Sequence, residues 1–140
     1  MVSPLPSILL VEDDDVDVEA IRRVFEKRRI ANPLLVAPDG IAAMKMLHGE
    51  GDTAPIQPPF VILLDLNLPR MNGIEFLNAL REDARLKDSI VIVLTTSNSD
   101  RDQIAAHAKS VAGYLLKSDL DEEFSRLVRE LRPVLRFLDN

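Results

Sequence analysis

Residues 8–25 read Ile8-Leu-Leu-Val-Glu-Asp-Asp-Asp-Val-Asp-Val-Glu-Ala-Ile-Arg-Arg-Val-Phe25, and this stretch decides the fold class. Its first four residues are a continuous apolar run, typical of a strand buried on both faces of a parallel sheet. A helical pattern follows, and its expected buried face consists of Val16, Ala20, Ile21, Val24 and Phe25. A strand that leads directly into an amphipathic helix is the repeating unit of an α/β fold.

Four further apolar runs follow the same plan, over Leu34–Ala37, Phe60–Leu64, Ile90–Leu94 and Gly113–Leu116. Helical patterns come after them, over Ile41–Leu47, Gly73–Leu80, Ser99–Lys109 and Phe124–Leu131. This alternation predicts an α/β fold of three layers, with helices on both sides of a parallel sheet and right-handed crossovers. The segment Gly49–Pro59 holds three prolines and two glycines, so we expect a surface loop. That loop is either a partner-contact element or a tolerated insertion.

The composition fits one ordinary globular domain. The chain has 140 residues, of which 46% are hydrophobic and 29% charged, and we expect one domain over residues 1–140. Its core should cover about residues 7–131, with a helical extension over 132–140. A net charge of −6 argues against nucleic acid, and apolar runs of five or six residues argue against a membrane span. The absence of cysteine suits the cytoplasm. His48 and His107 are interpreted as solvated helix residues without a role in the site.

Polar residues gather where the predicted strands end. They are Glu12, Asp13 and Asp14 after the first run, Asp65 after the third, Thr95, Thr96 and Ser97 after the fourth, and Lys117 after the fifth. Open parallel α/β sheets bind their ligands at the carboxyl ends of the strands. A purely structural sheet does not need acids, hydroxyls and a lysine there, although a single aspartate such as Asp14 or Asp15 is often only a helix cap. We therefore expect the set to form one site.

The expected site has the chemistry of a metal-dependent phosphoryl acceptor. The carboxylates of Glu12, Asp13 and Asp65 would repel one another unless a hard divalent cation bound to them, and Mg²⁺ suits such ligands. Lys117 would give its positive charge to one phosphoryl oxygen, and a threonine hydroxyl after the fourth strand would donate a hydrogen bond to another. Asp65 would keep one oxygen with which to attack phosphorus and form an acyl phosphate.

Four motifs, in this order, resemble those of two-component response-regulator receivers. They are Ile8-Leu-Leu-Val-Glu-Asp-Asp14, Ile62-Leu-Leu-Asp-Leu-Asn-Leu-Pro-Arg-Met-Asn-Gly73, Val91-Ile-Val-Leu-Thr-Thr96 and Gly113-Tyr-Leu-Leu-Lys117. The intervals agree as well, with 30 residues from Asp65 to Thr95 and 22 from Thr95 to Lys117. The resemblance covers about residues 7–131, and it implies the flavodoxin-like (βα)5 receiver fold with strand order 2-1-3-4-5.

The resemblance also implies roles for single residues in metal binding. Asp65 is then the phosphoacceptor. Asp13 and Asp65 bind Mg²⁺ through their side chains, and Glu12 acts mostly through a bound water. Asn67 gives its backbone carbonyl to the metal, so its side chain is free to vary. Gly73 fits the turn into the third helix.

The resemblance further implies how the phosphoryl group is bound and sensed. Thr95, Thr96 and Lys117 are then the phosphoryl-binding residues, and Thr96, where a small residue is frequent, narrows the approach to the site. Thr95 and Tyr114 form the switch, in which Tyr114 turns inward as Thr95 moves toward the phosphate. The alternative for Tyr114 is an ordinary half-buried strand residue. Ser118 stands where the family usually has a proline.

The implied function is a phosphorylation switch, and not an enzyme, that receives its phosphoryl group from a sensor histidine kinase and acts through protein contacts. Four further features narrow the resemblance to a subfamily. They are the proline-rich segment before the third strand, Leu66-Asn-Leu-Pro69, Leu94-Thr-Thr-Ser97 and Lys117-Ser118. Together these features resemble the stand-alone regulators that are paired with bacteriophytochrome kinases.

Two other functions compete with this one. A phosphohydrolase with an aspartyl-phosphate intermediate places a second acid two residues after its nucleophile, where this chain has Asn67. A flavin- or nucleotide-binding module needs a glycine-rich loop after the first strand. Residues 12–17 instead carry five acids, which would repel a phosphate. Both alternatives are therefore weaker hypotheses.

The C-terminal tail continues the apolar stripe of the last helix through Leu131, Leu135 and Leu138. An exposed apolar stripe is a contact site unless it folds back onto the domain. We expect a homodimer that forms through the last helix and this tail, with fold-back as the alternative.

Overall fold

The structure is a computed structural model that describes residues 6–49, 61–66, 73–96 and 111–131. Its elements in chain order are β1 (Ile8–Val11), α1 (Asp15–Lys27), β2 (Leu34–Ala37), α2 (Gly40–His48), β3 (Val61–Asp65), α3 (Gly73–Glu82), β4 (Ile90–Thr95), β5 (Gly113–Leu116), a 3-10 helix (Lys117–Asp119) and α5 (Leu120–Glu130). Each of the five predicted strands is present. The predictions for residues 50–60, Asn67, the helix over 99–109, His107 and the tail over 132–140 fall outside the described residues.

The strands form one parallel sheet in the order β2-β1-β3-β4-β5, which is the order that the resemblance implied. The register pairs Val11 of β1 with Leu64 of β3, and Thr95 of β4 with Leu116 of β5. Because all the strands point the same way, their carboxyl ends meet at one edge of the sheet. The residues that follow these ends are therefore neighbours in space.

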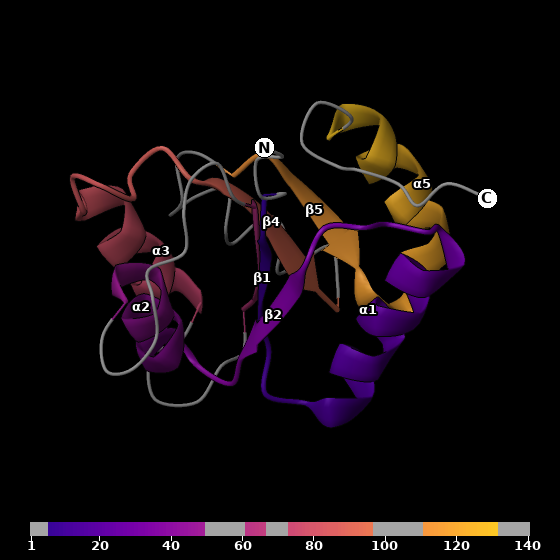
Figure 1. The fold of residues 1–140 in the computed structure, drawn as a ribbon, viewed down its shortest axis with the longest axis horizontal. Helices are drawn as coiled ribbons and strands as arrows, with labels where there is room; N and C mark the ends of the chain where they lie inside the picture. The colour runs from indigo at the N-terminus through magenta and orange to yellow at the C-terminus, as the bar shows by residue number, and fades with distance from the viewer. Residues whose placement is uncertain (1–5, 50–60, 67–72, 97–110, 132–140) are drawn as a thin grey trace, which may run out of the picture.

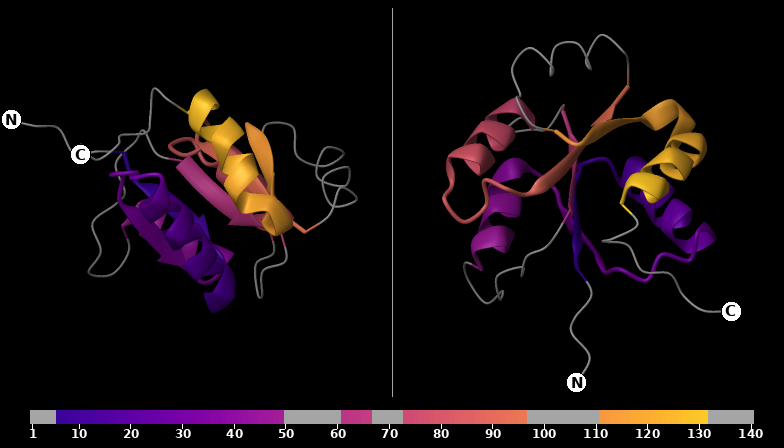
Figure 2. Two further views of the ribbon diagram at one scale, coloured as in Figure 1. Left: turned by 90° about the vertical axis from the view of Figure 1, so that its right-hand side faces the viewer. Right: turned by 90° about the horizontal axis from the view of Figure 1, so that it is seen from above.

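Helices cover both faces of the sheet and make the three predicted layers, as the view from above in Figure 2 shows. Helices α1 and α5 lie on one face, and α2 and α3 lie on the other (Figure 1). Side chains alternate along a strand, so Leu9 and Val11 join the core under α2 and α3. Ile8 and Leu10 join the core under α1 and α5. The continuous apolar runs are thus explained by burial on both faces.

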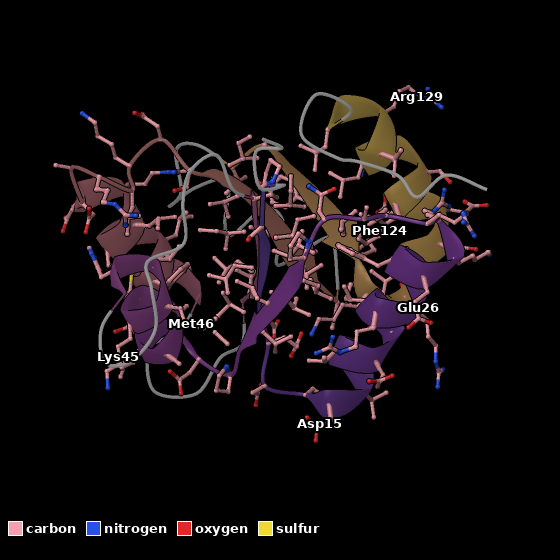
Figure 3. All side chains as sticks on the ribbon, viewed as in Figure 1. Asp15, Glu26, Lys45, Met46, Phe124 and Arg129 are labelled. Carbon is pink, nitrogen blue, oxygen red and sulfur yellow. The ribbon has the colours of Figure 1, made fainter. Side chains whose placement is uncertain are left out.

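Aromatic contact joins the two helices of the α1–α5 layer. The rings of Phe25 and Phe124 meet edge to face, with their centroids 5.8 Å apart. Figure 3 shows Phe124 between α5 and α1, whereas Arg129, on the same helix, points to solvent. The helical patterns predicted over Gly73–Leu80 and Phe124–Leu131 are confirmed, and each helix buries one apolar face, which includes Phe76 and Leu80 in α3 and Leu127 in α5.

Helix α1 corrects one prediction about the buried face. Val16 was expected on that face, but it is 77% exposed, and Val18 is buried in its place beside Ile21. At about 100° per residue, Val16 lies about 140° around the helix from Ile21, whereas Val18 is three residues away on the same side. The cap prediction holds for Asp14, whose carboxylate accepts hydrogen bonds from the backbone N–H of Val16 and of Asp17.

None of the helices in the described part of the chain is long and apolar enough to cross a membrane.

Candidate functional site

Three acids converge at the carboxyl ends of the two central strands. Glu12 and Asp13 follow β1 directly, and Asp65 is the last residue of β3. The register of β1 against β3 brings Glu12 level with Asp65, and the backbone N–H of Glu12 still pairs with Ala37 of β2 at 2.9 Å. One carboxylate oxygen from each of the three acids lies within 4.8 Å of the others. The predicted convergence is confirmed.

The three acids differ in their access to solvent. Glu12 and Asp65 are buried, with 1% and 4% of their surface exposed, whereas Asp13 is exposed. A cation would therefore approach from the side of Asp13 and find two buried carboxylates behind it. An all-oxygen donor set of this kind fits a hard divalent ion such as Mg²⁺, Mn²⁺ or Ca²⁺.

Lys117 faces the same cluster from the end of β5. Its Nζ lies 2.7 Å from Oε2 of Glu12 and 3.3 Å from Oδ1 of Asp65. It also donates a hydrogen bond of 2.8 Å to Oδ2 of Asp17, in the first turn of α1. The sequence prediction missed Asp17. The sequence held one indication of Asp17, an acid four residues after Asp13. That indication is not specific, because acids are common in the first turn of a helix, where the helix dipole stabilises them.

Burial and charge shift the pKa values of Glu12 and Lys117. Burial raises the pKa of Glu12 to about 7, the hydrogen bond from Lys117 opposes that rise, and the charge of Asp65 adds to it. Burial alone would lower the pKa of Lys117. The hydrogen bonds to Asp17 and Glu12 and the charge of Asp65 outweigh it, so the pKa of Lys117 lies above its ordinary value. Lys117 is thus firmly cationic among the three carboxylates.

The hydroxyl residues lie at the same edge of the sheet. Thr95 is the last residue of β4 and is 2% exposed. Its strand lies between β3, which ends at Asp65, and β5, which leads into Lys117. Thr96 follows it and is exposed. Asp65 and Thr95 end two adjacent strands and Lys117 directly follows the next one, as a single binding site would require.

Gly73 closes the segment that follows Asp65, and the structure shows why this position needs a glycine. Its backbone N–H bonds to the carbonyl of Leu66 at 3.1 Å. A Cβ atom on Gly73 would lie 2.8 Å from both the carbonyl oxygen of Asp65 and Cα of Leu66. Because these are backbone atoms, any side chain here would displace the backbone of Asp65.

The β5–α5 junction holds the remaining candidates. Tyr114 is half-buried and packs against the core under α2 and α3. Its carbonyl accepts a hydrogen bond of 3.0 Å from Arg126 of α5. Lys117 and Ser118 begin the 3-10 helix that leads directly into α5, so this junction is regular although Ser118 replaces the usual proline.

One residue without an assigned role gains a partner. His48 was interpreted as a solvated residue, but its Nε2 lies 2.8 Å from Oδ2 of Asp83. The backbone N–H of Arg85 lowers the pKa of Asp83, and the charge of His48 adds to that effect. The partner lies 35 residues away and is brought close by the packing of α2 beside α3.

Comparisons with known proteins agree with this geometry. The model of the response regulator receiver domain family matches residues 8–129. The response regulator Rcp1 of Synechocystis sp. is 37% identical over 127 residues, which are 91% of this chain and 86% of that protein. A structure of the Mn²⁺-bound form of Rcp1 is similar with a TM-score of 0.72 and 36% identity, and the match covers 91% of each chain.

Two solved bacteriophytochrome response regulators are similar over nearly the whole chain. RtBRR has a TM-score of 0.87 and 33% identity, and the match covers 97% of this chain and 83% of that one. AtBRR has a TM-score of 0.84 and 31% identity, and the match covers 99% of both chains.

Proposed function

The chain belongs to the response regulator receiver domain family, and we propose that Asp65 is the residue on which it accepts a phosphoryl group. Receivers of this family act in two-component signalling with sensor histidine kinases. The observation that carries the choice of Asp65 is its position at the end of β3. It is buried there between the acids that suit a divalent cation and the ammonium group of Lys117.

The residues have distinct tasks in this proposal. Glu12, Asp13 and Asp65, with the backbone carbonyl of Asn67, would hold Mg²⁺, which supplies positive charge to the phosphoryl oxygens when it is bound. Lys117 gives its charge to a further oxygen, and the hydroxyls of Thr95 and Thr96 donate hydrogen bonds.

An oxygen of Asp65 bonds to phosphorus as the bond between phosphorus and the donor breaks, and an acyl phosphate results. Thr95 and Tyr114 then transmit the change. Tyr114 is half-buried and packs against the core under α2 and α3, and we propose that it turns further inward.

The finer points of the proposal concern partners. We propose that the kinase is a bacteriophytochrome, since RtBRR and AtBRR are regulators of that kind. The chain would act in the cytoplasm as one domain, would not itself be an enzyme, and would not bind nucleic acid, which suits its net charge of −6. The phosphohydrolase alternative is not favoured, because the relatives are response regulators.

The test of the phosphoacceptor is a labelling experiment. The chain is incubated with acetyl phosphate or a bacteriophytochrome kinase in the presence of Mg²⁺, and we expect one acid-stable, base-labile adduct. Asp65→Asn and the addition of EDTA should each abolish it. Labelling of the Asp65→Asn variant would refute the assignment, and labelling that survives chelation would remove the metal from the mechanism.

We also propose a homodimer that forms through α5 and residues 132–140. Leu131 at the end of α5 is buried, and the apolar residues of the tail continue beyond it in the sequence. Sedimentation at micromolar concentration should show a dimer that is lost on truncation after Arg132. A monomer at every concentration, with or without a phosphoryl mimic, would refute this part of the proposal.

A further inference from the structure

We propose that Asp17 is a positioning residue for Lys117, which keeps hold of the ammonium group when Glu12 and Asp65 turn to a bound divalent cation. The inference rests on the proposed function, because it concerns the cation and the lysine of that same site. It adds a fourth acid to the site, in a different role from the other three.

The starting point is that three carboxylates share the ammonium group of Lys117. An ammonium group has three N–H donors, and three carboxylates surround that of Lys117. The distances from Nζ are 2.7 Å to Glu12, 2.8 Å to Asp17 and 3.3 Å to Asp65. A phosphoryl oxygen must therefore compete with these carboxylates for Lys117.

The three carboxylates are not equivalent. Among the described residues, the cluster that could hold a metal consists of Glu12, Asp13 and Asp65, and Asp17 is not part of it. A cation at the cluster draws Glu12 and Asp65 toward itself and leaves Asp17 with Lys117. The side of the ammonium group that faced Glu12 and Asp65 then becomes available to phosphoryl oxygens, while its hydrogen bond to Asp17 stays.

Asp17 is well placed to stay where it is. Its backbone N–H is bonded at 3.3 Å to the cap residue Asp14, so the position at the start of α1 is fixed. Helices α1 and α5 are tied together a second time, because Lys27 and Arg28 both contact Asp121. The distance between α1 and the start of α5 therefore need not change when the cation binds.

Without Asp17, the carboxylates beside Lys117 in the described part of the chain would be those of Glu12 and Asp65. A cation would have to take both, and it would leave a mostly buried ammonium group, 13% exposed, with no carboxylate beside it. That outcome is costly, because a buried charge needs a partner. Removal of Asp17 should therefore weaken binding of the cation, although Asp17 does not touch it.

A simpler possibility is that Asp17 attracts the cation only by its negative charge. In the parent protein that charge is offset by Lys117, so removal of Asp17 would then matter more when Lys117 is absent. If Asp17 acts by holding Lys117, its removal matters chiefly when Lys117 is present. The two possibilities predict opposite couplings between Asp17 and Lys117, which a double-mutant cycle measures.

The test is titration calorimetry of Mg²⁺ binding to the parent chain, Asp17→Asn, Lys117→Met and the double variant. Loss of a residue that orients metal ligands typically costs about 10- to 100-fold in affinity, and we expect about tenfold for Asp17→Asn. In the Lys117→Met background the same change should cost about twofold or less. A loss in that background as large as in the parent, or larger, would overturn the inference.

Asp15→Asn is the matched control. It removes the same charge from the same turn of α1, and Asp15 lies at the outer end of the helix and points away from the sheet (Figure 3). An exposed charge is screened by salt, so we expect the control to lose about twofold or less. Suppose that the parent binds Mg²⁺ and is labelled at Asp65, while Asp17→Asn loses no more Mg²⁺ affinity than Asp15→Asn. That result would refute only this inference. A parent that does neither refutes the proposed function as well.

Nitrogen-15 NMR of the lysine side chains gives a readout that is independent of affinity. In the parent, the ammonium signal of Lys117 should persist after Mg²⁺ is added, because Asp17 still protects it from exchange with water. In Asp17→Asn the signal should be lost on addition of Mg²⁺, and Asp17→Glu should restore it in part. A signal that persists in Asp17→Asn with Mg²⁺ bound would contradict the inference.

Discussion

Two groups of ion pairs join α1 to the β5–α5 segment, and they differ in environment far more than in length. At the first turn of α1, Lys117 meets Asp17 at 2.8 Å, and at the last turn Lys27 meets Asp121 at 2.5 Å. The side chains of Lys117 and Asp17 are 13% and 33% exposed, and that of Glu12, which also contacts Lys117, is 0% exposed. The side chains of Lys27 and Asp121 are 67% and 51% exposed.

This difference shows that the distance between two charges does not by itself determine how much an ion pair contributes to stability. Water solvates the Lys27–Asp121 pair almost as well when it is broken as when it is made, so the pair contributes little. Glu12 and Asp65 have lost that solvation and depend on Lys117 or on a bound cation. The buried group is thus poised to respond to a metal or a phosphoryl group, whereas the exposed group only helps α5 to stay beside α1.

The largest effect should come from removal of the buried lysine. Without Mg²⁺ at pH 8, Lys117→Met leaves Glu12 and Asp65 with no cation, and the free energy of unfolding should fall by about 3 kcal/mol. Lys27→Met should change it by little more than the error of the measurement. Urea unfolding followed by circular dichroism measures both, and saturating Mg²⁺ should recover much of the loss in Lys117→Met. Equal losses in the two variants would remove the distinction between the regions.

The second effect is the change of stability with pH, which should have opposite signs for Glu12 in the buried group and Asp121 in the exposed group. The folded-state pKa of Glu12 is raised from 4.5 to about 7. The folded protein therefore binds this proton more tightly, and stability falls as pH rises from about 4.5 to about 7, by about 2–3 kcal/mol. Glu12→Gln should flatten the metal-free stability curve over that interval, and Mg²⁺ should flatten it in the parent. A parent curve without this fall would show that Glu12 titrates normally.

A smaller effect should separate charge from neutral hydrogen bonding within the buried region. The chain has one tyrosine and no tryptophan, so tyrosine emission reports on Tyr114 alone. Thr95→Ala should weaken binding of the phosphoryl mimic beryllofluoride by about 1 kcal/mol, the worth of one neutral hydrogen bond. Thr95→Ala should also reduce, without abolishing, the change in Tyr114 emission that beryllofluoride binding causes.

Lys117→Ala should abolish that change, since a charge-assisted bond is about twice as strong as a neutral one and ties the phosphoryl group to the rest of the site. If both variants respond as the parent does, the switch lies elsewhere.

The smallest effect should come from the exposed pair. Hydrogen bonding and charge from Lys27 lower the pKa of Asp121. Its stabilisation is therefore present above the unfolded-state pKa and is lost as pH falls through the lower folded-state pKa, the opposite sign to Glu12. Asp121→Asn should reduce stability only slightly at low salt, and about 1 M NaCl should remove the difference. Unfolding curves at two salt concentrations check this, and a loss that salt does not reduce would place Asp121 with the buried group.

The sequence was enough for the elements in the described part of the chain and for the convergence of the three acids. Buried strands such as Ile8–Val11 must be apolar throughout, so the order of strands and helices can be found from residues that are neighbours in the chain. The ends of parallel strands must share one edge, so the sequence alone predicts that Glu12, Asp13 and Asp65 lie together. The local pattern does not predict which of two nearby valines of α1 faces the core, because that depends on the rotation of the helix about its axis. Val16 is exposed and Val18 is buried.

The tertiary structure alone decided which charged side chains meet. Asp17 and Lys117 are 100 residues apart, and His48 and Asp83 are 35 apart. Nothing in the sequence near either acid distinguishes it from the other acids of the same helix or turn. Such contacts depend on how far and at what angle one helix packs beside another element, and that geometry is set by the whole core. The hydrophobic pattern of the chain thus specifies the layers, whereas the packing of those layers specifies the partners of Lys117.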